Sequence, residues 1–154
     1  MRLSVLAPLP GRVVPLQDLP DPVFSGATLG PGVAVDPPRE RIEAVAPIDG
    51  RLVKLQQQVF VVVAVLPEGG AGVLVHLGID TAKLRGEGFT LYVDEGAEVT
   101  AGQKIVGWDP AAVEAGGRSP VCPVVALDAK PEAVSGIAEP GDIATGDPLF
   151  TLSL

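Results

Sequence analysis

VLVHLGIDTAKLRGEGF, residues 73–89, is the stretch on which the fold and the chemistry of this 154-residue chain depend. It opens as an apolar run typical of a strand, and the run ends near His76, the only histidine in the chain. Gly78 then breaks the strand, and Asp80 and Thr81 follow it. Because chemistry near neutral pH needs an imidazole or another side chain that ionises in that range, His76 is the first candidate for a reactive residue.

The composition predicts an all-β protein. Hydrophobic residues make up 47% of the chain and charged residues 19%, which excludes a disordered polypeptide. Glycines and prolines separate many short apolar runs, a pattern typical of an antiparallel β-sandwich or barrel. The length suits a single domain covering residues 1–154. Strands are expected at residues 3–7, 12–14, 32–35, 52–55, 60–66, 72–77, 124–127 and 149–152.

Charge and cysteine content exclude several classes of protein. The chain has 11 Lys and Arg against 19 Asp and Glu, a net charge of −8, and no basic cluster, so we expect a basic protein partner and no nucleic acid. The longest apolar run, Val59–Leu66, is too short to span a membrane, and the first residues lack the apolar core of a secretion signal. Cys122 has no second cysteine to pair with. We therefore expect a cytoplasmic protein with an inert core thiol at Cys122.

Two internal repeats predict that the sandwich has pseudo-symmetric halves. Residues 7–16 match residues 46–55 at six of ten positions, and residues 95–105 resemble residues 139–149. Each repeat reads as a strand, a turn and a second strand, with glycine where the backbone must turn sharply.

A long surface loop is expected at residues 17–37, because its prolines and glycines exclude a helix of any length. This loop carries the apolar pair Val23 and Phe24. Such a pair reads either as an anchor folded onto the core or as a contact surface. A tight turn is expected at residues 67–70, between the two most apolar strands.

Helical structure should be minimal. One helical turn is expected at residues 79–84, with the Asp80 side chain accepting hydrogen bonds from the amides that follow. A second short helix is expected at residues 110–115, where Asp109 is placed as the N-cap, Pro110 takes the first position and glycines follow the last turn.

Six segments together carry a specific pattern: HLGIDT at 76–81, LRGEGF at 84–89, EGAEVTAGQ at 95–103, APLPGRVVPLQDLPDPVFSG at 7–26, APIDG at 46–50 and SPVCPVVAL at 119–127. This series resembles the glucose-class enzyme IIA of the bacterial phosphoenolpyruvate-dependent sugar phosphotransferase system. The resemblance covers nearly the whole chain, in the family's order.

The resemblance implies a phosphocarrier. Members of the family are antiparallel β-sandwiches that receive phosphate on a histidine from the protein HPr and pass it to the IIB component of a IIB/IIC sugar permease. The matching phosphoacceptor is His76, and Asp80 matches the acidic residue beside it. Val23, Phe24 and Phe60 match the apolar rim on which partners dock.

The chemistry of a phosphoacceptor histidine can be argued from the imidazole itself. A neutral ring attacks phosphorus through its unprotonated nitrogen, so the other nitrogen must keep its proton and needs a fixed acceptor. The backbone carbonyl of Gly78 is our candidate for that acceptor. Phosphoryl transfer asks mainly for positioning and charge stabilisation, which a single histidine on a rigid strand can supply.

One family feature is missing, the second histidine on the neighbouring strand. Gln58 stands in its place when Phe60 and the valines after it are matched, although counting back from His76 leads instead to Val61. Glutamine keeps a hydrogen-bond donor but never carries a positive charge. We therefore expect His76 to accept phosphate and onward transfer to IIB to be weakened or lost. With a single imidazole, we expect neither a zinc site nor any other cofactor.

Two other interpretations remain open at this point. The chain could be a degenerate enzyme IIA-like module that binds proteins without productive transfer. It could also be a sandwich related to biotinyl or lipoyl carriers, which the turn sequences EGAEVTAGQ and EPGDIATGD suggest. Those carriers need a lysine at an exposed hairpin tip, and none of the lysines lies in such a motif: Lys54, Lys83, Lys104 and Lys130.

Overall fold

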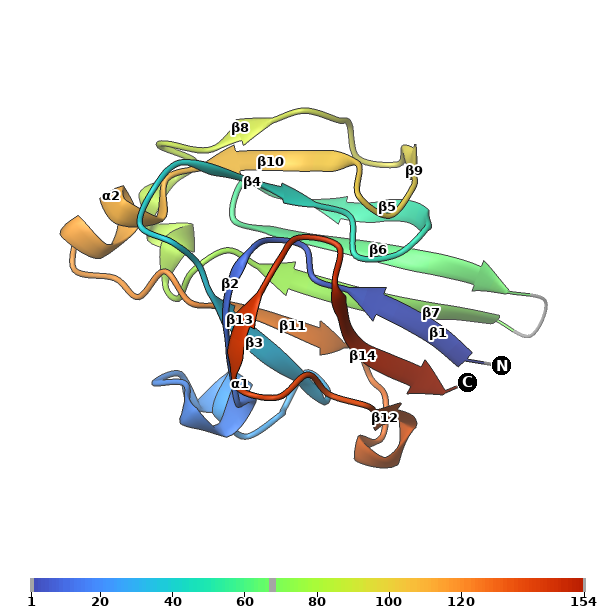
Figure 1. Cartoon of the computed structure of the whole chain (residues 1–154). Helices are drawn as coiled ribbons and strands as arrows, with labels where there is room; N and C mark the ends of the chain where they lie inside the picture. The colour runs from blue at the N-terminus through green and yellow to red at the C-terminus, as the bar shows by residue number, and fades with distance from the viewer. Residues whose placement is uncertain (1, 67–68, 154) are drawn as a thin grey trace.

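Eight antiparallel strands form the main sheet, in the order β13-β2-β3-β11-β7-β6-β5-β9 (Figure 1). The structure, a computed structural model, describes residues 2–66 and 69–153. In sheet order the strands are β13 Gly141–Ile143, β2 Gly11–Val14, β3 Gly32–Asp36, β11 Cys122–Ala126, β7 Gly69–His76, β6 Val59–Leu66, β5 Gly50–Leu55 and β9 Glu98–Val99. Part of the turn expected at residues 67–70 lies outside the described residues.

Two three-stranded antiparallel sheets cover one face of the main sheet. One has the order β1-β14-β12 and the other the order β4-β10-β8. Their strands are β1 Arg2–Leu6, β14 Pro148–Ser153, β12 Val134–Ser135, β4 Ile42–Val45, β10 Lys104–Trp108 and β8 Thr90–Leu91. Because β1 pairs with β14, the two ends of the chain lie side by side (Figure 1). The fold is thus an antiparallel β-sandwich, as the sequence predicts.

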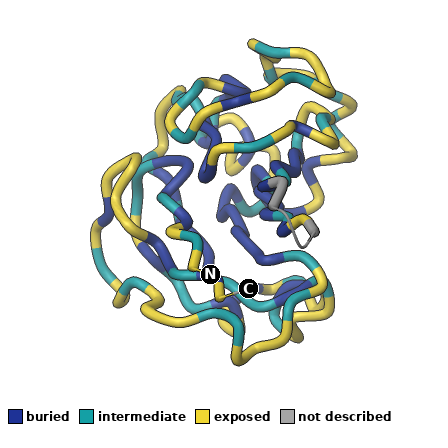
Figure 2. The backbone as a smooth tube through the Cα atoms, turned by 90° about the vertical axis from the view of Figure 1, so that its right-hand side faces the viewer, coloured by how far each residue is buried: buried dark blue, intermediate teal, exposed yellow. Residues whose placement is uncertain are grey.

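The main core lies where the three sheets meet. Phe60 on β6, Trp108 on β10 and Phe150 on β14 are among its largest fully buried side chains, and each comes from a different sheet. Figure 2 shows the buried segments gathered between the layers and the exposed residues on the outer turns. Burial of these apolar side chains is the main force that stabilises the sandwich.

A second, smaller core covers the outer face of the main sheet. It is built by the segment that follows β2, which contains the 3₁₀ turn η1 Leu16–Asp18 and the helix α1 Pro22–Ser25. Leu16, Leu19 and Phe24 from this segment pack on apolar residues of β6, β7 and β11. This packing places the α1 segment against the end of β7, where His76 lies.

The expectation that residues 17–37 contain no helix was wrong by one turn, because α1 forms within them. The Asp21 side chain accepts a hydrogen bond from the Val23 N–H at 2.8 Å and caps this turn. Pro22 takes the first helical position, where its missing N–H costs nothing and its fixed φ suits the helix. The proline that seemed to exclude a helix therefore starts one.

The backbone confirms the pseudo-symmetry. Each repeat begins with the same pair of hydrogen bonds, at 2.8 to 2.9 Å: Ala7 N–H to Asp147 O and Gly146 N–H to Ala7 O in one half, Ala46 N–H to Gln103 O and Gly102 N–H to Ala46 O in the other. The next strand pairs also correspond. Gly11 of β2 lies opposite Ile143 of β13, as Gly50 of β5 lies opposite Val99 of β9.

The remaining helical elements are short. The helix α2 spans Pro110–Ala115, and the Asp109 side chain caps it by accepting from the amides of Ala111 and Ala112, which confirms that prediction. Among the described residues, the other helical elements are the 3₁₀ turns η2 Thr81–Leu84 and η3 Pro131–Ala133. The turn η2 follows β7 directly and belongs to the candidate site.

Candidate functional site

His76 is the last residue of β7 and lies opposite Val59 of β6. Its ring is partly buried and meets the ring of Phe24 edge-on, with 5.5 Å between the ring centroids and 62° between the ring planes. Phe24 itself is held in the second core. The α1 segment therefore fixes one side of the imidazole by packing.

The His76 Nδ1 atom lies 2.5 Å from the carbonyl oxygen of Gly78, the contact that the sequence predicts. A carbonyl only accepts hydrogen bonds, so Nδ1 carries the proton of the neutral ring and Nε2 keeps its lone pair. The turn needs glycine at position 78, because φ is +82° and an added Cβ would lie 2.6 Å from Cγ2 of Thr81.

Two further hydrogen bonds hold this turn in place. The hydroxyl of the fully buried Thr81 donates to the carbonyl of Leu77 at 2.7 Å. The Ile79 N–H donates to the carbonyl of Ser119 at 2.8 Å, which ties the turn to the segment before β11. The Gly78 carbonyl is thus fixed from both sides, as a group that orients an imidazole must be.

Asp80 does not cap η2 with its side chain, so that prediction was wrong. Its backbone adopts the left-handed conformation with φ of 61°, whereas a capping residue is normally extended. The carboxylate makes no cap hydrogen bond, and only the backbone carbonyl of Asp80 accepts, from the Lys83 N–H at 3.3 Å. The exposed carboxylate is left available beside the site.

Burial lowers the pKa of His76 below its ordinary value, since a charged ring loses solvation inside the protein. The hydrogen bond to Gly78 and the carboxylates of Asp21 and Asp80 partly oppose this shift, and Lys54 adds to it. The ring is therefore neutral at neutral pH, the form in which one ring nitrogen can act as a nucleophile.

Asp21 is a residue of the site that the sequence reading missed. With Asp80, Arg118 and Ser119 it lines a hollow next to the end of β7. The sequence does contain a pattern that could have revealed this residue: Asp21 followed by Pro22 is typical of an N-cap and the first position of a helix. The pattern lies inside the segment that was predicted to be a loop.

Gln58 immediately precedes β6 and is the neighbour of Val59, the residue that pairs with His76. Its backbone carbonyl accepts from the Leu77 N–H at 2.7 Å, while its side-chain amide donates to the Gln56 side chain at 3.2 Å. Within the described residues, no hydrogen bond joins Gln58 to the imidazole. Val61, the other position considered for the missing histidine, pairs with Leu74 farther along the hairpin. The hydrogen bond to Leu77 thus holds the Gln58 backbone next to the end of β7 that carries His76.

The expected apolar rim is only partly present. Val23 is 43% exposed on α1, as a docking residue should be. Phe24 is only 6% exposed, which supports the anchor interpretation. Phe60 is 0% exposed and faces the main core, so its assignment to the rim was wrong. Neighbouring residues of a strand point to opposite faces, and Val59, not Phe60, shares a face with His76.

The other reactive groups lie away from this chemistry. Cys122 is buried, burial raises the pKa of its thiol, and the thiol donates to the carbonyl of Pro120 at 3.3 Å. No group of three or more His, Cys, Asp or Glu side chains within residues 2–66 and 69–153 could hold a metal ion. In the same part of the chain, no helix is long and apolar enough to cross a membrane.

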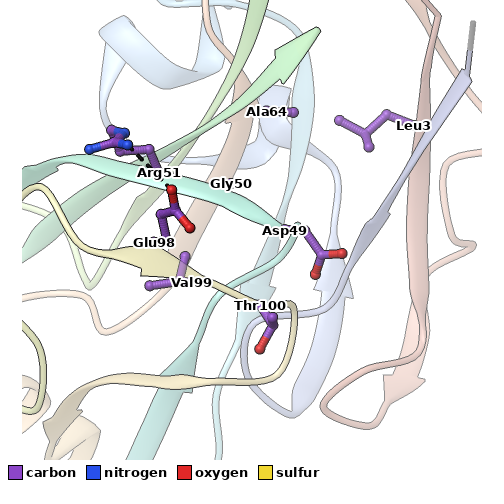
Figure 3. Close-up of a pocket in the computed structure, with 8 residues that line it drawn as sticks. All are labelled: Leu3, Asp49, Gly50, Arg51, Ala64, Glu98, Val99 and Thr100. Atoms are coloured by element: carbon purple, nitrogen blue, oxygen red, sulfur yellow. Dashed lines mark hydrogen bonds and ion pairs between the residues drawn. The ribbon is translucent and has the colours of Figure 1, made fainter.

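A second hollow lies toward the other end of β6 (Figure 3). Leu3, Asp49 and Ala64 line it together with the ion pair of Arg51 and Glu98, 3.4 Å apart. Ala64 is five residues beyond Val59, which places this hollow about 17 Å along the strand from the histidine. It contributes nothing to the His76 site.

Comparison with known proteins gives a consistent result. Residues 3–131 match the family described as phosphoenolpyruvate-dependent sugar phosphotransferase system, EIIA 1. A glucose-specific EIIA component of Oceanobacillus iheyensis is 40% identical over 123 residues, which cover 80% of this chain and 73% of that protein. A counterpart in Bacillus anthracis is 36% identical over 122 residues, 79% of this chain and 72% of that protein.

Two further relatives extend the comparison. A glucose-specific EIIBCA component of Corynebacterium glutamicum is 35% identical over 127 residues, which cover 82% of this chain but 18% of that protein. The solved structure of glucose permease IIA from Mycoplasma capricolum superposes with a TM-score of 0.86 at 30% identity, covering 98% of this chain and 96% of that one.

Proposed function

The chain belongs to the EIIA 1 family of the phosphoenolpyruvate-dependent sugar phosphotransferase system, and we propose that it works there through His76 as the phosphoacceptor. In this proposal Nε2 of His76 takes a phosphoryl group from HPr and passes it to a IIB component of a sugar permease. The observation that carries the proposal is the contact between Nδ1 and the Gly78 carbonyl, which leaves Nε2 as the free nucleophile.

The transfer needs no further acid or base on this chain. The lone pair of Nε2 attacks phosphorus, the new N–P bond forms as the bond from phosphorus to HPr breaks, and the Nδ1 proton stays on the ring. The positive charge that develops on the imidazole is stabilised by the Gly78 carbonyl. The carboxylates of Asp21 and Asp80 act in the same sense, since both favour a charged ring.

The same two carboxylates suit a basic partner. They lie beside the histidine in a chain of net charge −8, and opposite charge steers association and orients the encounter. The exposed Val23 on α1 adds an apolar contact at the rim. These features support HPr and IIB as partners. The proposal also assigns the protein to the cytoplasm, with residues 1–154 working as one domain.

Onward transfer to IIB should be weakened by the missing second imidazole. A protonated imidazole adds the attraction of a positive charge to its hydrogen bond with a phosphate oxygen, which the neutral amide of Gln58 cannot do. Its side chain is also engaged with Gln56. The variant Gln58→His should therefore donate phosphate to IIB faster than the parent, with transfer from HPr little changed. Equal donation rates in the two proteins would refute this explanation.

A second candidate function rests on the same missing histidine. The chain could bind regulatory partners through the His76 face, as a degenerate module that does not pass phosphate on. Incubation with phosphoenolpyruvate, enzyme I and HPr separates the two functions. Label on the parent and none on His76→Ala supports the phosphocarrier. An unlabelled parent in the presence of phosphorylated HPr refutes it and leaves the binding module.

A further inference from the structure

Lys54 lies on the same face of the main sheet as His76, two strands away. It pairs with Val61 of β6, which pairs in turn with Leu74 of β7. The next row on this face holds Val59 and His76. Residues directly opposite one another share a face, and so do residues two apart on one strand, so the Lys54 and His76 side chains leave the sheet on the same side.

The spacing of the strands brings the two side chains within reach of each other. Two strand separations of about 4.8 Å and a step of two residues of about 3.4 Å each put the Cα atoms about 12 Å apart. A lysine stem and an imidazole bearing phosphate extend toward each other across such a gap. The charge of Lys54 already acts on the ring: next to burial, the main cause, it contributes to the lowered pKa of His76.

Lys54 is exposed and makes no ion pair within the described residues, unlike Arg39, Arg51 and Lys104. Glu95 comes near, accepting a hydrogen bond from the Leu55 N–H, but it forms no salt bridge with Lys54. The chain has a net charge of −8, so a cation without an ion-pair partner close to the reactive histidine is unusual in it. Such a cation can attract an anion that is bound there only for part of each reaction cycle.

We propose that the Lys54 ammonium contacts the phosphoryl group carried by Nε2 of His76 and supplies the positive charge that the second imidazole would supply. Lysine binds phosphate as a mobile point charge, which fits a ligand that arrives and leaves with each transfer. Gln58 cannot play this part because its amide is never cationic. This inference rests on the proposed function of His76.

The test compares the parent with Lys54→Met, Lys54→Arg and the matched control Lys130→Met. Lys130 is also exposed and without an ion pair within the described residues, but it lies beyond the opposite end of β11. Each protein is brought to equilibrium with phosphorylated HPr, and the phosphorylated fraction is measured. The phosphorus resonance is then titrated by NMR to obtain the pKa of the bound phosphoryl group.

Lys54→Met should lower the equilibrium constant for phosphorylation about fivefold, the upper range for an exposed ion pair, and raise the phosphoryl pKa. Lys54→Arg and Lys130→Met should keep the parent values. If Lys54→Met and Lys130→Met have the same equilibrium constant and the same phosphoryl pKa, the contact with Lys54 is refuted. Labelling of the parent would still support the role of His76 in that case. Slower transfer from HPr with an unchanged equilibrium and pKa also refutes it, because Lys54 would then only dock the partner. An unlabelled parent overturns both proposals.

Discussion

Replacing Gly78 by alanine should disturb the turn that holds His76, and Gly88→Ala provides a matched control. Both glycines have positive φ, +82° at Gly78 and +85° at Gly88. An added Cβ at Gly88 would meet nothing within 4 Å, whereas at Gly78 it would lie 2.6 Å from Thr81 Cγ2 and 3.1 Å from the Ser119 carbonyl. The two variants share the backbone strain and differ in the clash.

The magnitude follows from these contacts. The left-handed conformation costs alanine about 1–2 kcal/mol at either position. Thr81 cannot easily give way, since it is fully buried and its hydroxyl donates to Leu77 O. Overpacking at such a site adds about 1–3 kcal/mol, so Gly78→Ala should cost about 2–5 kcal/mol of unfolding free energy in total. Gly88→Ala should cost only the about 1–2 kcal/mol that alanine loses in the left-handed conformation.

Urea unfolding measures the difference. With a slope of about 2 kcal/mol/M, the extra 1–3 kcal/mol should place the Gly78→Ala midpoint roughly 1 M below that of Gly88→Ala. Phosphorylation of His76 in folded protein should also fall for Gly78→Ala alone, because the carbonyl that orients the ring must shift. Equal midpoints and equal phosphorylation for the two variants would show that the Gly78 turn is not packed as described.

Three further predictions follow from burial and charge. The rate of phosphoryl transfer to His76 should fall at low pH with a midpoint below about 6.5, because burial lowers the imidazole pKa from that ordinary value. By the same shift, the folded protein should lose stability as the pH falls from about 6.5 toward the folded-state pKa; a transfer midpoint above 6.5 would contradict the assignment. Phe24→Ala should cost about 3 kcal/mol of unfolding free energy and Val23→Ala less than about 0.5, while the latter slows transfer from HPr. Equal urea midpoints for the two would contradict the anchor role of Phe24. The Cys122 thiol should react with a thiol reagent only after urea unfolds the protein, since it is buried and its pKa is raised. Rapid reaction of the native protein would show that the Cys122 thiol is accessible to solvent and would contradict its burial in the core.

The features that the sequence predicts correctly are those set by local chemistry. Asp109, Pro110 and the glycines after residue 115 specify α2 within a few residues of one another, so no tertiary contact is needed to find it. The Gly78 carbonyl is two residues from His76, and a turn at glycine brings the two together. The repeats reveal the pseudo-symmetry because both halves use the same turn residues.

The features that were missed depend on which face of a strand turns inward. Residues 59–64 are all apolar, so the sequence gives no alternation from which to tell that Phe60 faces the main core and Val59 faces the histidine. Asp21 reaches the site only because α1 folds back over β7, a contact between distant segments. The left-handed backbone of Asp80, which turns a predicted cap into an open carboxylate, likewise depends on the packed turn around it.

The central claim, that Nε2 of His76 carries the phosphate while Nδ1 stays bound to Gly78, is tested most directly by nitrogen NMR. The chain has one histidine, so protein labelled with ¹⁵N-histidine gives a single pair of ring resonances. After phosphorylation by HPr, phosphorus coupling should appear on Nε2, and Nδ1 should remain protonated. Coupling on Nδ1, or phosphorylated protein with an unchanged imidazole, would contradict the account.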